Sequence, residues 1–189
     1  MEAPESLPGM IAVRDRILHA IRRKQPIATY GDYDADGVLS STILATTLRM
    51  FGADVSIVLP RRDEGYGLSV AAVKRFADEG KRLVITVDNG ISALEPIRIA
   101  DRLGLDVAII DHHQRQEETP AAAAILWEPR YCASGLAMMT AWALLDAERG
   151  TERAARTAES LSKLAAIATI ADCIPLSGAG RTVCKPRPW

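Results

Sequence analysis

Short apolar segments alternate with helical segments along most of this chain, and this alternation limits the possible folds more than any other feature. The apolar segments are residues 27–30, 55–59, 83–87, 107–110 and 122–126, and the helical segments between them are 38–51, 69–79 and 93–103. Strands that alternate with helices of about ten or more residues form parallel sheets. Because these strands are apolar on both faces, both faces of the sheet should be covered. The sequence therefore predicts an α/β fold with a parallel five-stranded sheet flanked by helices.

The two ends of the chain follow other patterns. Residues 10–24 have the spacing of an amphipathic helix, and Pro26 ends it. Residues 134–149 and 153–171 predict a C-terminal pair of helices joined around Gly150. The last residues show no periodicity and contain two prolines. We therefore expect three parts, namely an N-terminal helical segment (1–25), the main α/β domain (26–176) and a tail or truncated junction to a missing domain (177–189).

Composition excludes several classes of protein. With 48% hydrophobic residues and a net charge of −1 over 189 residues, the chain is not of the disordered class. No apolar run approaches the ~18 residues of a membrane helix, and the N-terminus lacks a signal pattern, so we expect a cytoplasmic protein without a membrane partner. The near-neutral charge argues against a broad basic surface for nucleic acid. Three widely spaced cysteines suggest neither a disulfide framework nor a zinc knuckle.

Polar side chains follow three of the predicted strands where each strand ends. They are Asp32, Asp34 and Asp36 after the first strand, Asp88 after the third, and Asp111, His112 and His113 after the fourth. In open parallel sheets, ligands bind beyond the carboxyl ends of the strands, which meet at one edge. We therefore expect these groups to lie close together in space although they are far apart in the sequence.

So many carboxylates in one pocket repel one another unless some keep a proton or cations lie among them. Asp34, Asp36, Asp88 and one later aspartate carry four negative charges, which two divalent cations would balance. Oxygen ligands with a single imidazole favour Mn²⁺ or Mg²⁺ over zinc. Two such ions ~4 Å apart are suited to phosphodiester hydrolysis. The pattern thus predicts a hydrolase with two Mn²⁺ or Mg²⁺ ions.

Two simpler interpretations compete with this one. Asp32, Asp34 and Asp36 match the first three ligand positions of a calcium-binding loop, but Ile43 stands where that loop requires a bidentate glutamate. Aspartates also form turns and cap helices without binding anything. The second interpretation would suffice for one aspartate, but three alternating aspartates opposite a histidine pair favour the metal site.

Five motifs in order resemble the DHH phosphoesterase superfamily and, within it, the RecJ-type single-strand-specific exonucleases. The motifs are GDYDADG (31–37), PRRDEGYG (60–67), VDNGIS (87–92), DHH (111–113) and ADCIPL (171–176). Each motif is weak alone, but all five in this order are specific, and they span about residues 8–183. The resemblance implies the same parallel five-stranded fold and a 5′→3′ exonuclease that acts on single-stranded nucleic acid, with DNA favoured over RNA, in recombination and repair.

The resemblance also implies roles for particular residues. The implied metal ligands are Asp34, Asp36, Asp88 (bridging both ions), His112 and Asp172. His113 would contact the scissile phosphate, and Asp111 would orient a histidine or the loop. Asp32 fits the motif without a clear role. Among the basic residues near the predicted edge (Arg61, Arg62, Lys74 and Arg75), we expect Arg62 to bind substrate, although a solvated surface would explain all four.

The chain departs from the family pattern in two places. Many members of the superfamily have a histidine at the position of Tyr30, so one ion could bind more weakly here. RecJ-type enzymes also continue beyond the last motif into a domain that grips nucleic acid, and its motifs are absent from these 189 residues. Two other functions therefore stay open, namely hydrolysis of short oligonucleotides or small phosphodiesters, and a truncated or non-catalytic binding domain. Protein partners are not predicted.

Overall fold

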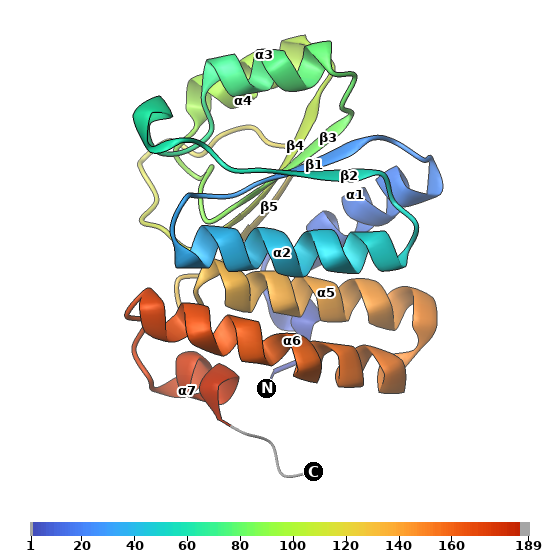
Figure 1. The fold of residues 1–189 in the computed structure, drawn as a ribbon, viewed down its shortest axis with the longest axis vertical. Coiled ribbons are helices and arrows are strands. Elements are labelled where there is room, and N and C mark those ends of the chain that lie inside the picture. Colours follow the sequence, from blue (N-terminus) through green and yellow to red (C-terminus); the bar gives the residue numbers. More distant parts are fainter. Residues whose placement is uncertain (1, 186–189) are drawn as a thin grey trace.

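Five parallel strands form one sheet in the computed structural model, which describes residues 2–185. The strands are β1 (Ile27–Tyr30), β2 (Val55–Val58), β3 (Leu83–Val87), β4 (Asp106–Asp111) and β5 (Ala124–Trp127). They lie in the order β2-β1-β3-β4-β5, and every neighbouring pair is parallel (Figure 1). The predicted α/β fold and all five predicted strands are confirmed, with boundaries shifted by at most two residues.

Each central strand supplies apolar side chains to both faces of the sheet, because successive side chains of a strand point in opposite directions. In β3, Leu83 and Ile85 join the core on one face, whereas Val84 joins the core on the other. β4 does the same with Ile110 and Ile109. Helices therefore have to cover both faces, as the apolar runs in the sequence predict.

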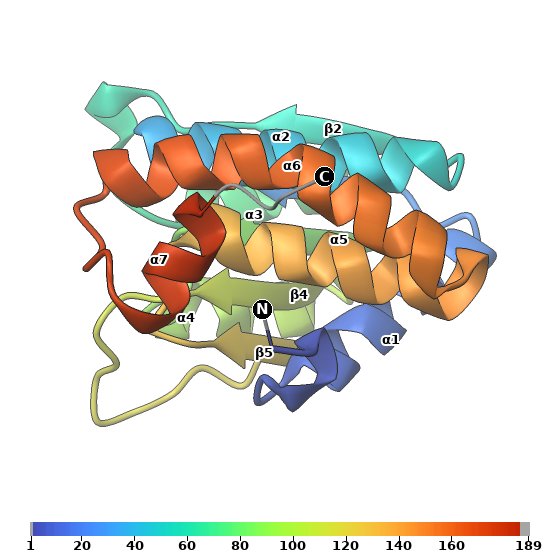
Figure 2. The ribbon, with the colours of Figure 1, turned by 90° about the horizontal axis from the view of Figure 1, so that it is seen from below.

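Helices form layers on the two faces of the sheet. The helices are α1 (Met10–Arg22), α2 (Ala35–Met50), α3 (Val70–Asp78), α4 (Leu94–Arg102), α5 (Ala133–Arg149), α6 (Thr151–Ala171) and α7 (Gly178–Cys184), with short 3₁₀ turns at Pro4–Ser6 and Arg62–Glu64. α3 and α4 cover one face, and α1, α2 and α5 cover the other. α6 packs mainly on α5 and α2 and forms an outer layer (Figures 1 and 2).

The C-terminal end of the described chain is more regular than its sequence suggests. We expected an irregular tail from residue 177, but Gly178–Cys184 forms α7, which packs on α6. Val183 is buried against the main core, and this contact stabilises a short helix whose two glycines give it little intrinsic helix propensity. The expected pair of C-terminal helices is therefore a set of three, and the final four residues lie outside the described part.

The strand order reverses direction between β1 and β3. The chain leaves β1 toward β2 at one edge of the sheet and then returns to β3 on the other side of β1. Such a point opens a crevice at the carboxyl ends of the two strands. Asp36 in the first turn of α2, which follows β1, and Asp88 in the loop that follows β3 both lie at this crevice. Among residues 2–185, no helix has the length and hydropathy required to cross a bilayer.

The backbone at Gly9, just before α1, lies very close to β5, and a substitution there tests this contact. Its φ is +86°, and a Cβ there would lie 1.8 Å from the carbonyl oxygen of Ile125 in β5. We expect Gly9→Ala to lower the free energy of unfolding by about 3 kcal/mol, since it combines left-handed strain with a backbone clash. Urea unfolding measures this. Gly52→Ala is the matched control, because Gly52 has a φ of +74° and open space around it; equal losses in the two variants would contradict the clash.

Candidate metal centre

His112 and Asp88 form the middle of an acidic cluster at the carboxyl edge of the sheet. His112 Nε2 lies 3.1 Å from Asp88 Oδ1, 3.7 Å from Asp36 Oδ2 and 3.7 Å from Asp172 Oδ2. These four residues follow β4, β3, β1 and α6, respectively. The fold thus brings together four of the five residues predicted to bind metal around a single imidazole nitrogen.

Asp36 is held by the N-terminus of a helix that belongs to a distant part of the sequence. The backbone N–H groups of Ala133 and Ser134 donate to its two carboxylate oxygens, at 2.6 and 2.8 Å, and the Ser134 hydroxyl donates to its carbonyl oxygen. The positive end of a helix dipole favours a carboxylate at this position. Asp36 is only 1% exposed, so the start of α5 fixes its orientation.

Asp34 and Asp32 lie in the loop that joins β1 to α2. Asp34 caps α2, because its side chain accepts a hydrogen bond from the N–H of Gly37 at 2.9 Å. Its position places it beside Asp88 and Asp32, within 4.8 Å. Asp32 is 4% exposed, and its Oδ1 has no hydrogen-bond partner in the described chain. An unpaired buried carboxylate oxygen is costly, so this atom is available to a cation.

Three overlapping groups of side chains have the spacing needed to hold a metal ion. In each group the potential ligand atoms lie within 4.8 Å of one another; the groups are Asp32–Asp34–Asp88, Asp88–His112–His113 and Asp36–His112–Asp172. Asp88 belongs to two of them. Burial and the neighbouring carboxylates of Asp36 and Asp34 raise the pKa of Asp88 to about 10. A divalent cation would replace the proton that relieves this repulsion, so the donor set fits Mn²⁺ or Mg²⁺.

Backbone geometry aims Asp88 into the cluster. Its φ is +65°, in the left-handed region that costs an aspartate about 1 kcal/mol or more. Its N–H donates to the carbonyl oxygen of Ile110, which holds the turn against β4. Strain of this kind persists where the surrounding structure requires a particular side-chain direction, as it does in this cluster.

The carboxylate of Asp111 forms hydrogen bonds with neighbouring residues of the protein. Its Oδ1 accepts hydrogen bonds from the N–H groups of His112 and His113 and from His113 Nδ1, and its Oδ2 accepts one from the N–H of Ile91. These donors hold the pKa of Asp111 below its usual value, although burial opposes the shift. The carboxylate in turn raises the pKa of His113. Asp111 therefore orients the histidine loop, and its own oxygens are fully engaged.

Two aromatic residues that the sequence did not single out hold His113. The hydroxyl of Tyr66 donates to the carbonyl oxygen of Asp88 at 3.0 Å and lies 3.1 Å from His113 Nε2. The indole N–H of Trp127 donates to the carbonyl oxygen of His113 at 2.7 Å. The side chain of His113 remains 41% exposed, so its ring is fixed but reachable from solvent.

The predicted basic residues divide into two pairs. Arg62 is exposed, and its guanidinium lies 5.0 Å from the ring centroid of Tyr33, which follows β1. Burial raises the pKa of Asp32, and the charge of Arg62 opposes this shift. Arg61 is bound to Asp63 instead. Lys74 and Arg75 lie in the second half of α3, which runs away from the carboxyl edge. Their expected position near the site stays a prediction, whereas the charge of Arg62 acts on Asp32.

Tyr30 occupies the position where many members of the superfamily have a histidine. It is 2% exposed, packs edge-on against Phe76, and donates its hydroxyl proton to the carbonyl oxygen of Gly67 at 3.2 Å. It therefore anchors the loop that carries Tyr66. Here this position secures the wall of the site and offers no metal ligand.

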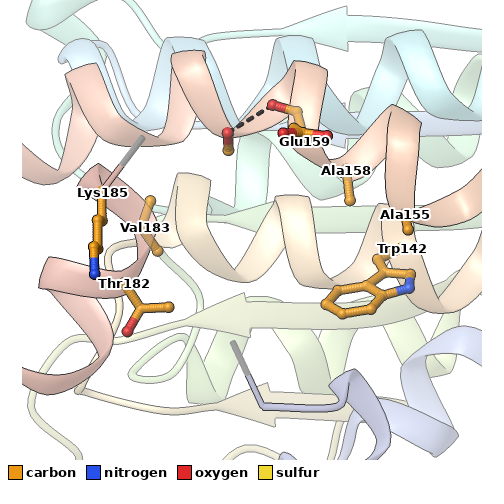
Figure 3. A pocket seen from close by; sticks show the side chains of 8 residues that line it. Trp142, Ala155, Ala158, Glu159, Thr182, Val183 and Lys185 are labelled. Carbon is orange, nitrogen blue, oxygen red and sulfur yellow. Dashed lines mark hydrogen bonds between the residues drawn. The ribbon is translucent and has the colours of Figure 1, made fainter. Parts of the chain in front are cut away.

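A pocket of about 440 Å³ opens beside the cluster. It is lined by Tyr66, Leu68, Ile91, Pro96 and His113, among others. Figure 3 shows a second pocket, between α5, α6 and α7, with space of about 20 Å³. That is about the room of one or two water molecules. Of these two pockets, the one beside His113 can admit an organic ligand.

The sequence did not reveal two kinds of contact. The aromatic partners of His113 gave no signal except the place of Tyr66 in the EGYG segment, and Trp127 gave none. The contact of Ala133 and Ser134 with Asp36 uses backbone N–H groups, which no side-chain pattern reveals. Asp172 was identified only through the family motif, because it caps the end of α6 and follows no strand.

Comparison with known protein families gives one match that covers most of the chain. The model of the DHH family, N-terminal domain, matches residues 26–171. The chain is 37% identical over 190 residues to the single-stranded-DNA-specific exonuclease RecJ of Bacillus subtilis, which covers 95% of this chain and 23% of the relative. For the enzyme of the same name from Haemophilus influenzae, the identity is 33%, with 92% of this chain and 33% of the relative covered.

Solved structures show the same similarity. A crystal structure of exonuclease RecJ bound to manganese superposes with a TM-score of 0.86 at 30% identity, over 94% of this chain and 46% of that one. RecJ of Thermus thermophilus in complex with Mn²⁺ gives a TM-score of 0.79 at 29% identity, over 94% of this chain and 26% of that one. The chain thus spans between a fifth and a third of the length of these two curated relatives.

Proposed function

This chain belongs to the DHH family, and on that premise we propose that it is a metal-dependent phosphodiesterase domain that degrades single-stranded DNA from the 5′ end. The observation that carries the proposal is the set of three overlapping ligand groups around Asp88 and His112. The names of the relatives support single-stranded DNA as the substrate, and the titles of the solved structures support manganese or magnesium as the metal. A role in DNA repair and recombination and a cytoplasmic location follow as proposals.

We assign the residues as follows. Asp34, Asp36, Asp88, His112 and Asp172 would hold two ions, with Asp88 between them. Bound Mn²⁺ or Mg²⁺ would supply polarisation of the phosphate and activation of a water. His113, which faces solvent beside the cluster, would donate a hydrogen bond to the scissile phosphate as negative charge develops. Asp111 would orient His113, and Arg62 would bind a phosphate of the substrate.

Residues 26–176 form the proposed catalytic unit, within which the family match falls.

The alternative of a short oligonucleotide or small phosphodiester as substrate has its own support. The pocket beside His113 can hold a mononucleotide-sized group, whereas a net charge of −1 provides little general attraction for a long polyanion. A dinucleotide would then be a better substrate than a long strand.

A hydrolysis assay tests the proposed function. With Mn²⁺, the chain should release mononucleotides from a 5′-labelled single strand, and Asp34→Ala should lower the rate by about a hundredfold or more, because a ligand of the ion is lost. Asp101→Asn is the matched control, since Asp101 is an exposed aspartate on α4. Preference for the dinucleotide would favour the smaller-substrate alternative. No metal binding by calorimetry and no hydrolysis of either substrate would leave a non-catalytic domain.

A further inference from the structure

Arg115 lies at the edge of the metal centre in a fixed position. It follows the histidine loop by two residues, and its guanidinium carbon lies 4.0 Å from the centroid of the Trp127 indole. Trp127 ends β5 and pairs in register with Asp111 at the end of β4. The same indole donates its N–H to the carbonyl oxygen of His113. One aromatic ring therefore connects the backbone of His113 with the charge of Arg115.

The charge of Arg115 is not neutralised within the described chain. Among residues 2–185, no carboxylate oxygen lies within ion-pair distance of its guanidinium, and the side chain is exposed. The comparison with Arg130 is informative, because that residue also covers an aromatic ring but is paired with Glu128 and Glu2. A guanidinium that stacks by its face keeps its N–H groups free at the edge, where they match the oxygens of a phosphate.

The opposite side of the metal centre has a similar arrangement. Arg62 lies over Tyr33 on the side of β1 and β2, and it too has no ion pair within the described part of the chain. Arg115 and Trp127 lie on the side of β4 and β5. The predicted metal ligands after β1, β3 and β4 lie between the two stacked arginines. A strand that crosses the carboxyl edge of the sheet would thus meet one positive charge on each side of the reacting phosphate.

We propose that Arg115, held on the Trp127 indole, binds a backbone phosphate of the nucleic acid on the β5 side of the metal centre. This inference rests on the proposed function and extends it, because it defines a binding position next to the site of hydrolysis. It also explains how a chain with a net charge of −1 can hold a polyanion, since two localised cations act where the strand passes.

The test compares Arg115→Gln with Arg98→Gln in the 189-residue chain. Arg98 is an exposed arginine on α4 that is paired with Glu95. Hydrolysis of a short single-stranded oligonucleotide and of bis(p-nitrophenyl) phosphate is measured with Mn²⁺, and binding of the oligonucleotide is measured by fluorescence anisotropy without metal. For Arg115→Gln, the ratio of kcat/KM on the oligonucleotide to kcat/KM on the small diester should fall about fivefold, mainly through KM. The slope of log K against log salt should become shallower by about 0.7.

Trp127→Phe separates the two roles of the indole. Phenylalanine keeps a ring under Arg115 but cannot donate to His113, so kcat should fall on both substrates while the salt slope stays that of the wild type. If Arg115→Gln matches Arg98→Gln in KM and in salt slope, the proposal is wrong. Equal losses on both substrates would also overturn it, because Arg115 would then act through His113. Failure of the proposed function itself is distinct, since the wild type would then hydrolyse neither substrate.

Discussion

Replacing Asp88 with asparagine should lower the rate of metal-dependent hydrolysis by about a thousandfold or more. The same change should raise the Tm of the metal-free protein. Asp88 contributes to two of the three ligand groups, so its loss affects both proposed ions. It is 2% exposed and lies beside Asp36 and Asp34, so the metal-free chain has to take up a proton at Asp88 when it folds, and an uncharged amide avoids this cost. Asparagine also tolerates the left-handed backbone at this position.

The raised pKa of Asp88 also predicts how the stability of the metal-free protein changes with pH. In the unfolded chain Asp88 loses its proton near its ordinary pKa of 3.8, whereas in the metal-free folded chain it keeps the proton up to about pH 10. The unfolded state therefore binds fewer protons between these values, and stability falls as the pH rises through this window. The Tm of the metal-free wild type should decrease across that range more steeply than that of Asp88→Asn.

Thermal unfolding with and without Mn²⁺ measures both effects. At a metal concentration about 100 times the Kd, bound metal should stabilise the wild type by about 2.7 kcal/mol, or roughly 5–10 °C in Tm, and Asp88→Asn should lose this response. Asp101→Asn, an exposed change of the same kind, should keep it. A metal-induced rise in Tm of wild-type size in Asp88→Asn would show that Asp88 is not a ligand.

Replacing Asp36 with alanine should lower both the rate of hydrolysis and the free energy of unfolding. Both oxygens of Asp36 accept hydrogen bonds from the start of α5, and the carboxylate also lies 3.7 Å from His112. Alanine would leave the N–H groups of Ala133 and Ser134 buried without an acceptor, at about 1–3 kcal/mol each. We expect a loss of about 3 kcal/mol in the free energy of unfolding by urea, and a loss of hydrolysis of about a thousandfold.

Asp36→Asn separates the two roles. Its amide oxygen can still accept one of the two N–H groups, so it should recover about half of the lost stability while hydrolysis stays low. Wild-type stability in Asp36→Ala would mean that the start of α5 does not depend on this carboxylate. Wild-type activity in Asp36→Asn would remove Asp36 from the metal site.

Most of the fold could be predicted because the central strands β1, β3 and β4 are buried on both faces and because glycine or proline follows most of the helices within a few residues. The errors occurred where side chains and tertiary contacts overrule local pattern. α2 begins at Ala35, inside a segment that the sequence presents as an irregular loop, because Asp34 caps it through Gly37. α7 forms in a glycine-containing segment because Val183 enters the core.

The site could be predicted only in part, for a physical reason. The positions of Asp36, Asp88 and His112 follow from one rule, that parallel strands end at a common edge. Asp172 obeys no such rule, since it ends a helix that packs mainly on other helices. The supports of His113 depend on the direction of single side chains from distant loops, which spacing in a sequence does not encode.

The outer position of α6 has a mechanical consequence. Of the five predicted ligands, Asp172 alone comes from the end of this outer helix, and it lies 3.7 Å from His112, which follows β4 of the inner sheet. An ion held by both residues would bridge α6 and the central sheet. Loss of the ion and detachment of the last turn of α6 from the sheet edge would then occur together. Backbone amides near Thr169 should then exchange their hydrogens with solvent more slowly when Mn²⁺ is present. During synthesis, this bridge could form only after α6 and Asp172 have left the ribosome.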